Sequence, residues 1–132
     1  MGSQFATLKQ LRDLMRAELR HISPNEFQDW QSFVSAEHPE PWDEFGWFVL
    51  DIGVEGQEGT TLFQALVATP AAVPRAKSND KQRRVLVVDS FEPEALAAAL
   101  KGHVSAVNAH TWDDIVEQLR RKMYWEYEKR WS

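Results

Sequence analysis

Residues 45–70, FGWFVLDIGVEGQEGTTLFQALVATP, constrain the fold more than any other stretch of the chain. Apolar side chains fill both alternating phases of residues 45–52, which predicts a strand contacted on both faces and central in its sheet. A second run, residues 60–69, is rich in β-branched and apolar residues and follows a break at 53–59 that holds glycines and glutamates. The two runs predict a β-hairpin with a loop longer than two residues, which Pro70 ends because it lacks an amide hydrogen.

Size and composition place the chain among globular proteins. Its 132 residues suit one domain with one core, and 43% hydrophobic residues, with six Trp and seven Phe, exclude a disordered chain. The absence of cysteine excludes disulfides, thiolate metal sites and a cysteine nucleophile. No apolar run approaches the roughly 20 residues that cross a bilayer. We therefore expect a soluble, cytoplasmic protein that does not enter a membrane.

The net charge of −5 is distributed unevenly. Residues 21–74 hold nine acidic residues and no Lys or Arg, whereas the rest of the chain carries eleven acids and fifteen bases. Phosphate contacts need basic groups, so this acidic block argues against a nucleic-acid partner. Two explanations stay open: the block binds a basic protein, or it is a solvated surface that keeps the chain soluble.

The N-terminal residues carry two overlapping patterns. Apolar spacings of three and four over residues 5–22 predict a helix, whereas alternation over residues 15–20 predicts a strand. Both cannot hold for the same residues, so we expect a short helix up to about Leu14 and a strand from Met15 or Arg16 to Ile22. Residues 1–14 are interpreted as an N-terminal extension or a cloning remnant, and residues 15–132 as a single domain.

A helix is predicted to start at Ser23, where a Ser cap precedes Pro24 and a capping-box Glu26. About three turns would place four apolar side chains on one face: Phe27, Trp30, Phe33 and Val34. Residues 38–42, HPEPW, cannot continue this helix, because each proline removes a donor and forces the preceding residue into extended geometry. They predict a loop that leads into the hairpin.

The chain after the hairpin predicts a loop, one strand and two helices. Residues 71–80 are loop-like with room for one helical turn, and the apolar run within residues 84–89 predicts a strand antiparallel to the hairpin. Residues 92–107 predict an amphipathic helix, in which Gly102 costs about 1 kcal/mol relative to Ala. Thr111 caps the last predicted helix, whose buried stripe runs from Trp112 to Tyr127.

These elements combine into one fold class. We predict an α+β fold in which an antiparallel sheet of about four strands, with a central β-hairpin, packs against two C-terminal helices. A short N-terminal helix would complete it.

No motif predicts catalysis, a metal or a cofactor. The four histidines do not fall at ligand spacings, and the chain has no nucleophile elbow, P-loop or dinucleotide fingerprint. Acids between the glycines of residues 53–59 would repel phosphate. Among adjacent carboxylates, Asp113 and Asp114 are explained by helix capping, and Asp43 and Glu44 have no evident partner base. We expect a protein that is not an enzyme.

Several stretches resemble the immunity protein 8 family of bacterial polymorphic toxin systems. The hairpin is followed much later by TWDDIVEQLRRKMYWEYEKRW, with MRAELRHISPNEF near the start. The most specific elements are Phe45-Gly46, Thr69-Pro70, Thr111-Trp112 and Trp125-Glu126. The resemblance covers about residues 15–131. It implies a small α+β protein that binds and neutralises a cognate toxin domain.

From this resemblance and the charge pattern we predict an immunity protein that blocks a toxin by stoichiometric occlusion through an acidic surface. The expected contacts lie in loops and at strand ends: Glu37, Glu40, Trp42, Asp43, Glu44, Glu55 and Glu58. An alternative is an adaptor or chaperone for a secreted effector, and a further one is a small enzyme. The sequence does not specify the oligomeric state or the toxin.

Overall fold

The sheet is built around the predicted hairpin. The computed structural model describes residues 14–25, 29–38, 43–78 and 84–128. Strand β2, Phe45–Val54, pairs along its length with β3, Thr60–Ala68, and on its other side with β1, Met15–Pro24. The hairpin, its central place and the strand that starts at Met15 are therefore confirmed. The predicted helix before Met15 lies outside the described residues.

The described sheet has six strands and is mixed, so the predicted four-stranded antiparallel sheet is wrong in detail. The order is β4-β3-β2-β1-β5, with β6 also paired to β3. Strand β5 is Asn108–Ala109, and β6 is Tyr124–Trp125. Strand β4, Val85–Val87, runs parallel to β3, not antiparallel as predicted. The reason is a helical crossover between the two strands, which returns the chain to the same end of the sheet.

That crossover holds more helix than predicted. The 3₁₀ turn η1, Pro70–Ala72, leads into helix α3, Val73–Ser78. The buried side chains of η1 and α3, Ala72 and Ala76, pack on Leu66 and Ala68 of β3. Packing against the sheet thus orders a segment whose sequence predicted mostly loop.

The helix expected from Ser23 begins later. Ser23 and Pro24 still pair with β2, because the ten-residue β2 offers them partners. Helix α2, Trp30–Ser35, is instead capped by Asp29, whose carboxylate accepts the Ser32 amide at 2.8 Å. That hydrogen bond lowers the pKa of Asp29.

The apolar face predicted for this helix is only partly correct. Phe33 is buried and Trp30 is packed against the core. Val34, expected on the same face, is 41% exposed. Phe27 lies outside the described residues.

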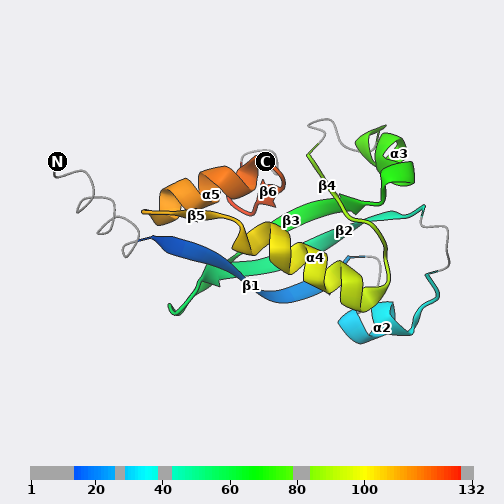
Figure 1. Ribbon diagram of the computed structural model, residues 1–132, viewed down its shortest axis with the longest axis horizontal. Helices are drawn as coiled ribbons and strands as arrows, with labels where there is room; N and C mark the ends of the chain where they lie inside the picture. The colour runs from blue at the N-terminus through cyan, green and yellow to red at the C-terminus, as the bar shows by residue number, and fades with distance from the viewer. Residues whose placement is uncertain (1–13, 26–28, 39–42, 79–83, 129–132) are drawn as a thin grey trace, which may run out of the picture.

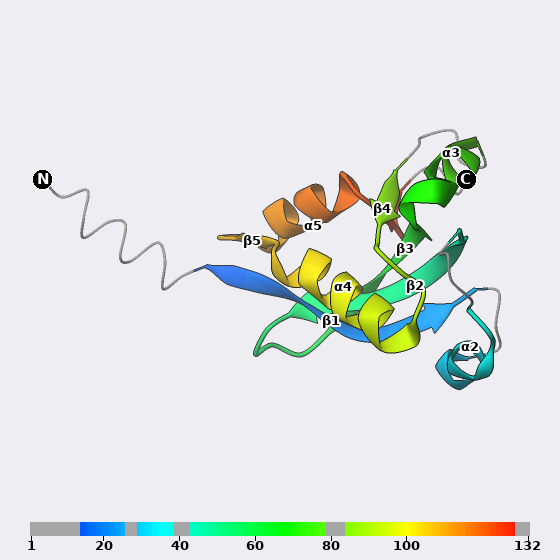
Figure 2. The same ribbon diagram turned by 45° about the vertical axis from the view of Figure 1, so that its right-hand side comes forward.

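Helices α4, Pro93–Ser105, and α5, Trp112–Arg120, cover one face of the sheet. Figures 1 and 2 show α4 crossing β1 and β2 with α5 beyond it. The predicted stripe of α4 is buried as Leu96, Leu100 and Val104. This stripe packs against the buried side chains of the central strands, among them Leu50, Ile52, Phe63 and Ala65. Both C-terminal helices are therefore confirmed.

Helix α5 ends at Arg120, which is shorter than predicted. The chain then turns, and Tyr124 and Trp125 pair with Gln64 and Phe63 of β3. The three-residue β4 pairs only with residues 66–68 of β3, so β6 supplies partners for backbone groups that β4 does not reach. Tyr127, predicted in the buried stripe, is 70% exposed as a result.

Candidate partner-binding surface

The predicted contacts at the start of β2 lie in a hydrogen-bonded corner. Buried Thr69 holds the Glu44 backbone, since its hydroxyl accepts the Glu44 amide at 3.0 Å and donates to the Glu44 carbonyl at 3.2 Å. The Glu44 carboxylate lies 3.1 Å from Nδ1 of His38. The other ring nitrogen of His38, Nε2, lies 2.9 Å from the Phe33 carbonyl oxygen. Glu44 thus tethers α2 to the hairpin.

The side chain of His38 is buried at this corner and only 5% exposed. Its ring packs on Phe33, with ring centroids 4.3 Å apart. The sequence signal was weak, because a lone histidine before a proline has no pattern that distinguishes a buried from an exposed position.

Asp43 and Glu37 are exposed at the same corner. The Asp43 carboxylate accepts a 2.7 Å hydrogen bond from Arg75 of α3, and both side chains are about half exposed. Part of the acidic charge at this end is therefore balanced within the chain. The predicted contacts Glu40 and Trp42 lie outside the described residues.

Glu55 and Glu58 occupy the turn between β2 and β3, and both are exposed. Gly56 and Gly59 adopt positive φ values of 81° and 92°, which only glycine adopts readily. No ion pair joins either glutamate to another described residue.

The turn is held by Arg20 of β1. Its guanidinium donates to the carbonyl oxygens of Val54 and Gly59, at 2.6 and 3.1 Å, and also to that of Gln57. Arg20 therefore holds the backbone that carries the two turn glutamates, and it forms no ion pair with either of them.

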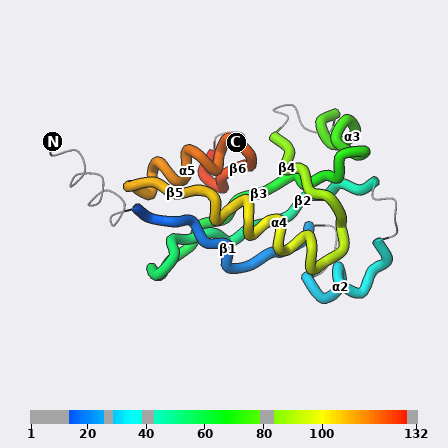
Figure 3. The backbone as a smooth tube through the Cα atoms, in the orientation of Figure 1, coloured from blue at the N-terminus to red at the C-terminus, as the bar shows by residue number. Residues whose placement is uncertain are grey.

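The two acidic groups lie at opposite ends of the hairpin. Ten residues of β2 separate Glu44 from Glu55, which corresponds to about 33 Å of extended chain. Figure 3 shows the turn between β2 and β3 at the far end of the strands from α2. The structure therefore brings Glu37, Asp43 and Glu44 together, and Glu55 and Glu58 together, but does not join the two sets.

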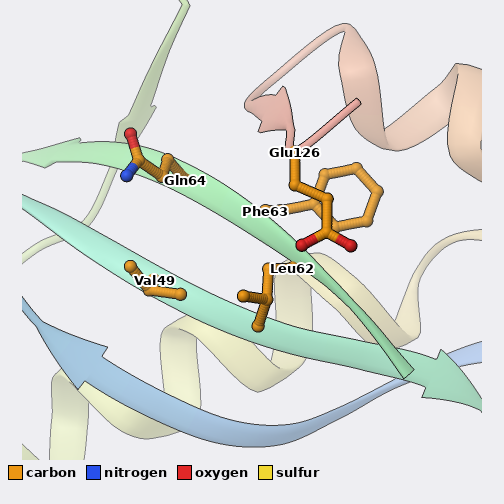
Figure 4. A pocket seen from close by; sticks show the side chains of 5 residues that line it. All are labelled: Val49, Leu62, Phe63, Gln64 and Glu126. Carbon is orange, nitrogen blue, oxygen red and sulfur yellow. The ribbon is translucent and has the colours of Figure 1, made fainter. Parts of the chain in front are cut away.

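Between these ends, one face of the hairpin is partly uncovered. A depression of about 220 Å³ is lined by Val49, Leu62, Phe63, Gln64 and Glu126 (Figure 4). Leu62 is 42% exposed, while Phe63 beside it is fully buried. Sequence reasoning missed this surface, because alternation shows that a strand has two faces but not which one a helix leaves bare.

Glu126 is fixed at the edge of this depression. Its carboxylate accepts the Thr61 hydroxyl at 2.8 Å, and its amide donates to the Leu62 carbonyl oxygen at 3.0 Å. The indole Nε1 of Trp125 donates to the same hydroxyl at 3.1 Å. The Trp125-Glu126 pair noted in the sequence thus fastens the C-terminal segment to β3.

Ligand clusters for a metal ion and membrane-spanning helices are both absent from the described part of the chain. No three His, Asp or Glu side chains there are grouped to hold a metal ion. Of the helices described, none has both the length and the apolar character to cross a membrane.

Comparison with known families settles what these elements belong to. The sequence profile described as Immunity protein 8 matches residues 17–130, which is most of the chain. The chain belongs to the Immunity protein 8 family. The resemblance inferred from the hairpin, from Thr111-Trp112 and from Trp125-Glu126 is confirmed. Searches of curated proteins and of solved structures found no significant match.

Membership of the Immunity protein 8 family gives the described surfaces a context. The family implies a toxin protein as the partner. Exposed charge and exposed apolar side chains are the features that could contact such a partner. The acids at the two hairpin ends and the bare hairpin face are the candidate contact surfaces.

Proposed function

We propose that this Immunity protein 8 family member binds a cognate bacterial toxin domain in the cytoplasm and inactivates it by stoichiometric occlusion, without catalysis. The observation that carries the proposal is the family match over residues 17–130. The charge pattern supports it, since residues 21–74 contain no Lys or Arg and include both hairpin strands.

The acidic surface would act on a basic toxin. A toxin that cleaves nucleic acid needs a positively charged cleft, and carboxylates held on a rigid hairpin would oppose that charge and speed association. We propose the contacts in two groups, one at each hairpin end. The first is Glu37, Glu40, Trp42, Asp43 and Glu44, and the second is Glu55 and Glu58.

Co-expression tests the function. Where a protein with a variable C-terminal domain is encoded immediately upstream, that domain is the partner to use, expressed in a host whose growth it stops. We expect growth to recover when this chain is co-expressed. Growth that stays arrested, with toxin levels maintained or raised, would contradict inhibition and favour the adaptor or chaperone.

Charge reversal tests the acidic surface. Glu55→Lys and Glu58→Lys, separately and together, should weaken toxin binding, because they place positive charge opposite a basic cleft. Glu117→Lys is the matched control, since Glu117 is also exposed but lies on α5. Unchanged affinity in both turn variants, with folding intact, would remove the turn from the contact surface.

A further inference from the structure

The two faces of the hairpin are covered very differently. Helices α4 and α5 bury the face that carries Leu50 and Phe63. On the opposite face, α3 covers Leu66 and Ala68 at the end of β3. Beyond α3, Val49 lies opposite Gln64, and Asp51 lies opposite Leu62. Neither pair is in the apolar clusters to which the described helices contribute.

These residues form a patch with an apolar centre and an acidic edge. We define the Leu62 patch as Val49, Asp51, Leu62, Gln64 and Glu126. Directly paired residues of neighbouring strands have Cβ atoms about 5 Å apart, so the Asp51 carboxylate lies beside the Leu62 side chain. Figure 4 shows Glu126 reaching over β3 from the C-terminal segment toward Leu62.

The patch carries negative charge that no base in the described part of the chain neutralises through an ion pair. No ion pair joins Asp51 or Glu126 to another described residue. Arg20, at the turn, pairs with Glu18 and with turn carbonyl oxygens. Arg84, on the other side, pairs with Glu128. Among the described residues that pair directly with the strand residues of the Leu62 patch, His21 of β1, opposite Asp51, is the only one with a basic side chain.

The patch is also preorganised. Phe63, which is fully buried, anchors the strand beneath Leu62, and the Thr61 hydroxyl fixes the Glu126 carboxylate. The Glu126 side chain would therefore lose little conformational entropy when a partner binds there. An exposed aliphatic centre within a polar rim is the usual anatomy of a protein interface.

We propose that the Leu62 patch is the central contact for the toxin domain, and that it receives an apolar side chain of the toxin flanked by Lys or Arg. Charge complementarity selects this occupant, because Asp51, which pairs with Leu62 across the hairpin, and Glu126, which lines the depression, are both acidic. The inference rests on the proposed function and adds to it a surface that the acidic loops do not include.

Leu62→Arg is the main test, measured by calorimetry with the purified toxin domain carrying an inactivating active-site substitution. The new side chain fills the depression and repels a basic partner, so Kd should rise about tenfold or more. Thermal unfolding should change little because Leu62 is 42% exposed. Leu62→Ser serves the same purpose if the arginine variant does not fold.

Val87→Arg is the matched control. Val87 is 45% exposed and lies in the edge strand β4, outside the Leu62 patch. The Val87→Arg substitution should leave the Kd for the toxin domain unchanged. Asp51→Asn should slow association and weaken its salt dependence, whereas Asp89→Asn, which removes the same charge from an exposed loop, should do neither.

The outcomes separate the two proposals. Failure of the wild-type chain to bind or neutralise the toxin overturns the proposed function, and the patch with it. Tight wild-type binding that Leu62→Arg leaves intact overturns the patch alone. Equal losses in Leu62→Arg and Val87→Arg also overturn it, because the effect would then not be local.

Discussion

Gly53 and Gly102 occupy opposite environments, although both lie inside regular elements. A Cβ atom on Gly53 would lie 2.5 Å from the Gly59 carbonyl oxygen and 2.9 Å from the guanidinium carbon of Arg20. At Gly102, on the exposed side of α4, a Cβ atom would meet no atom within 4 Å. Because Gly53 has no side chain, the Arg20 guanidinium can pass over β2 and reach the turn.

The same substitution at these two glycines should therefore have opposite effects. Gly53→Ala should destabilise the fold by about 2 kcal/mol or more, because backbone and guanidinium must shift. Gly102→Ala should stabilise it by up to about 1 kcal/mol, since Ala is the better helix former. Urea unfolding of both variants checks this. A stabilised Gly53→Ala would show that the turn does not close on β2 as described.

Glu128 is the most buried charged group described, with 3% of its side chain exposed. Its carboxylate accepts hydrogen bonds from Arg84 at 2.7 Å and from Arg120 at 2.8 Å. Burial raises the pKa of Glu128, but the hydrogen bonds from both arginines outweigh burial, and the net pKa is lowered. The carboxylate therefore ties β4, α5 and the C-terminal segment together.

Glu128→Gln should destabilise the protein by about 1–3 kcal/mol, with the arginines' partial exposure keeping the loss below that of a fully buried pair. The pKa of Glu128 is lower in the folded protein than the unfolded value near 4.5. The ionised carboxylate therefore contributes fully to the free energy of unfolding above that unfolded pKa. This contribution is lost as the pH falls through the pKa of the folded state. The variant should show a shallower acid limb in urea unfolding at pH from about 6 to about 3. Glu117→Gln, on exposed α5 surface, should behave as wild type.

At the scale of elements, local signals set where helix α5 begins. The Thr111 hydroxyl accepts the Asp114 amide at 3.2 Å, as the cap in the sequence predicted. Its end has no comparable signal, because residues 121–125 contain neither Gly nor Pro. The helix ends there because the chain turns and pairs with the edge of β3 as strand β6.

Thr111→Ala should cost about 1 kcal/mol, because one first-turn amide of α5 loses its partner. Thr111→Ser should retain most of the stability, since its hydroxyl can accept the same hydrogen. Thermal unfolding of the two variants distinguishes a capping role from a methyl-packing role. If serine costs as much as alanine, the hydroxyl is not what stabilises the helix start.

At the scale of the whole molecule, charge is separated between hairpin and C-terminal half. Asp51 lies on β2, and Glu44, Glu55 and Glu58 lie next to the ends of the hairpin strands, while Arg84 and Arg120 are paired with Glu128. We expect this arrangement to make the electrostatic potential around the hairpin negative, which is the condition for steering a basic partner.

Association with the toxin domain should slow as salt is added. Stopped-flow rates at ionic strengths from about 0.01 to about 0.5 M would span Debye lengths from about 30 Å to a few ångströms. A rate that does not change with salt would mean that the acidic residues do not steer encounter, and that apolar contact alone drives binding.

The sequence by itself determined the hairpin, the β1 strand, the buried stripe of α4 and the cap of α5, because alternation, helical spacing and capping are local properties. Recognition of the Immunity protein 8 family rested on those same residues. Only the tertiary structure decided that β4 runs parallel, that β6 replaces the end of α5, and that the hairpin acids form two separate groups. It also decided that Leu62 stays exposed, because exposure and pairing depend on which distant segments cover each strand, and no local pattern encodes that.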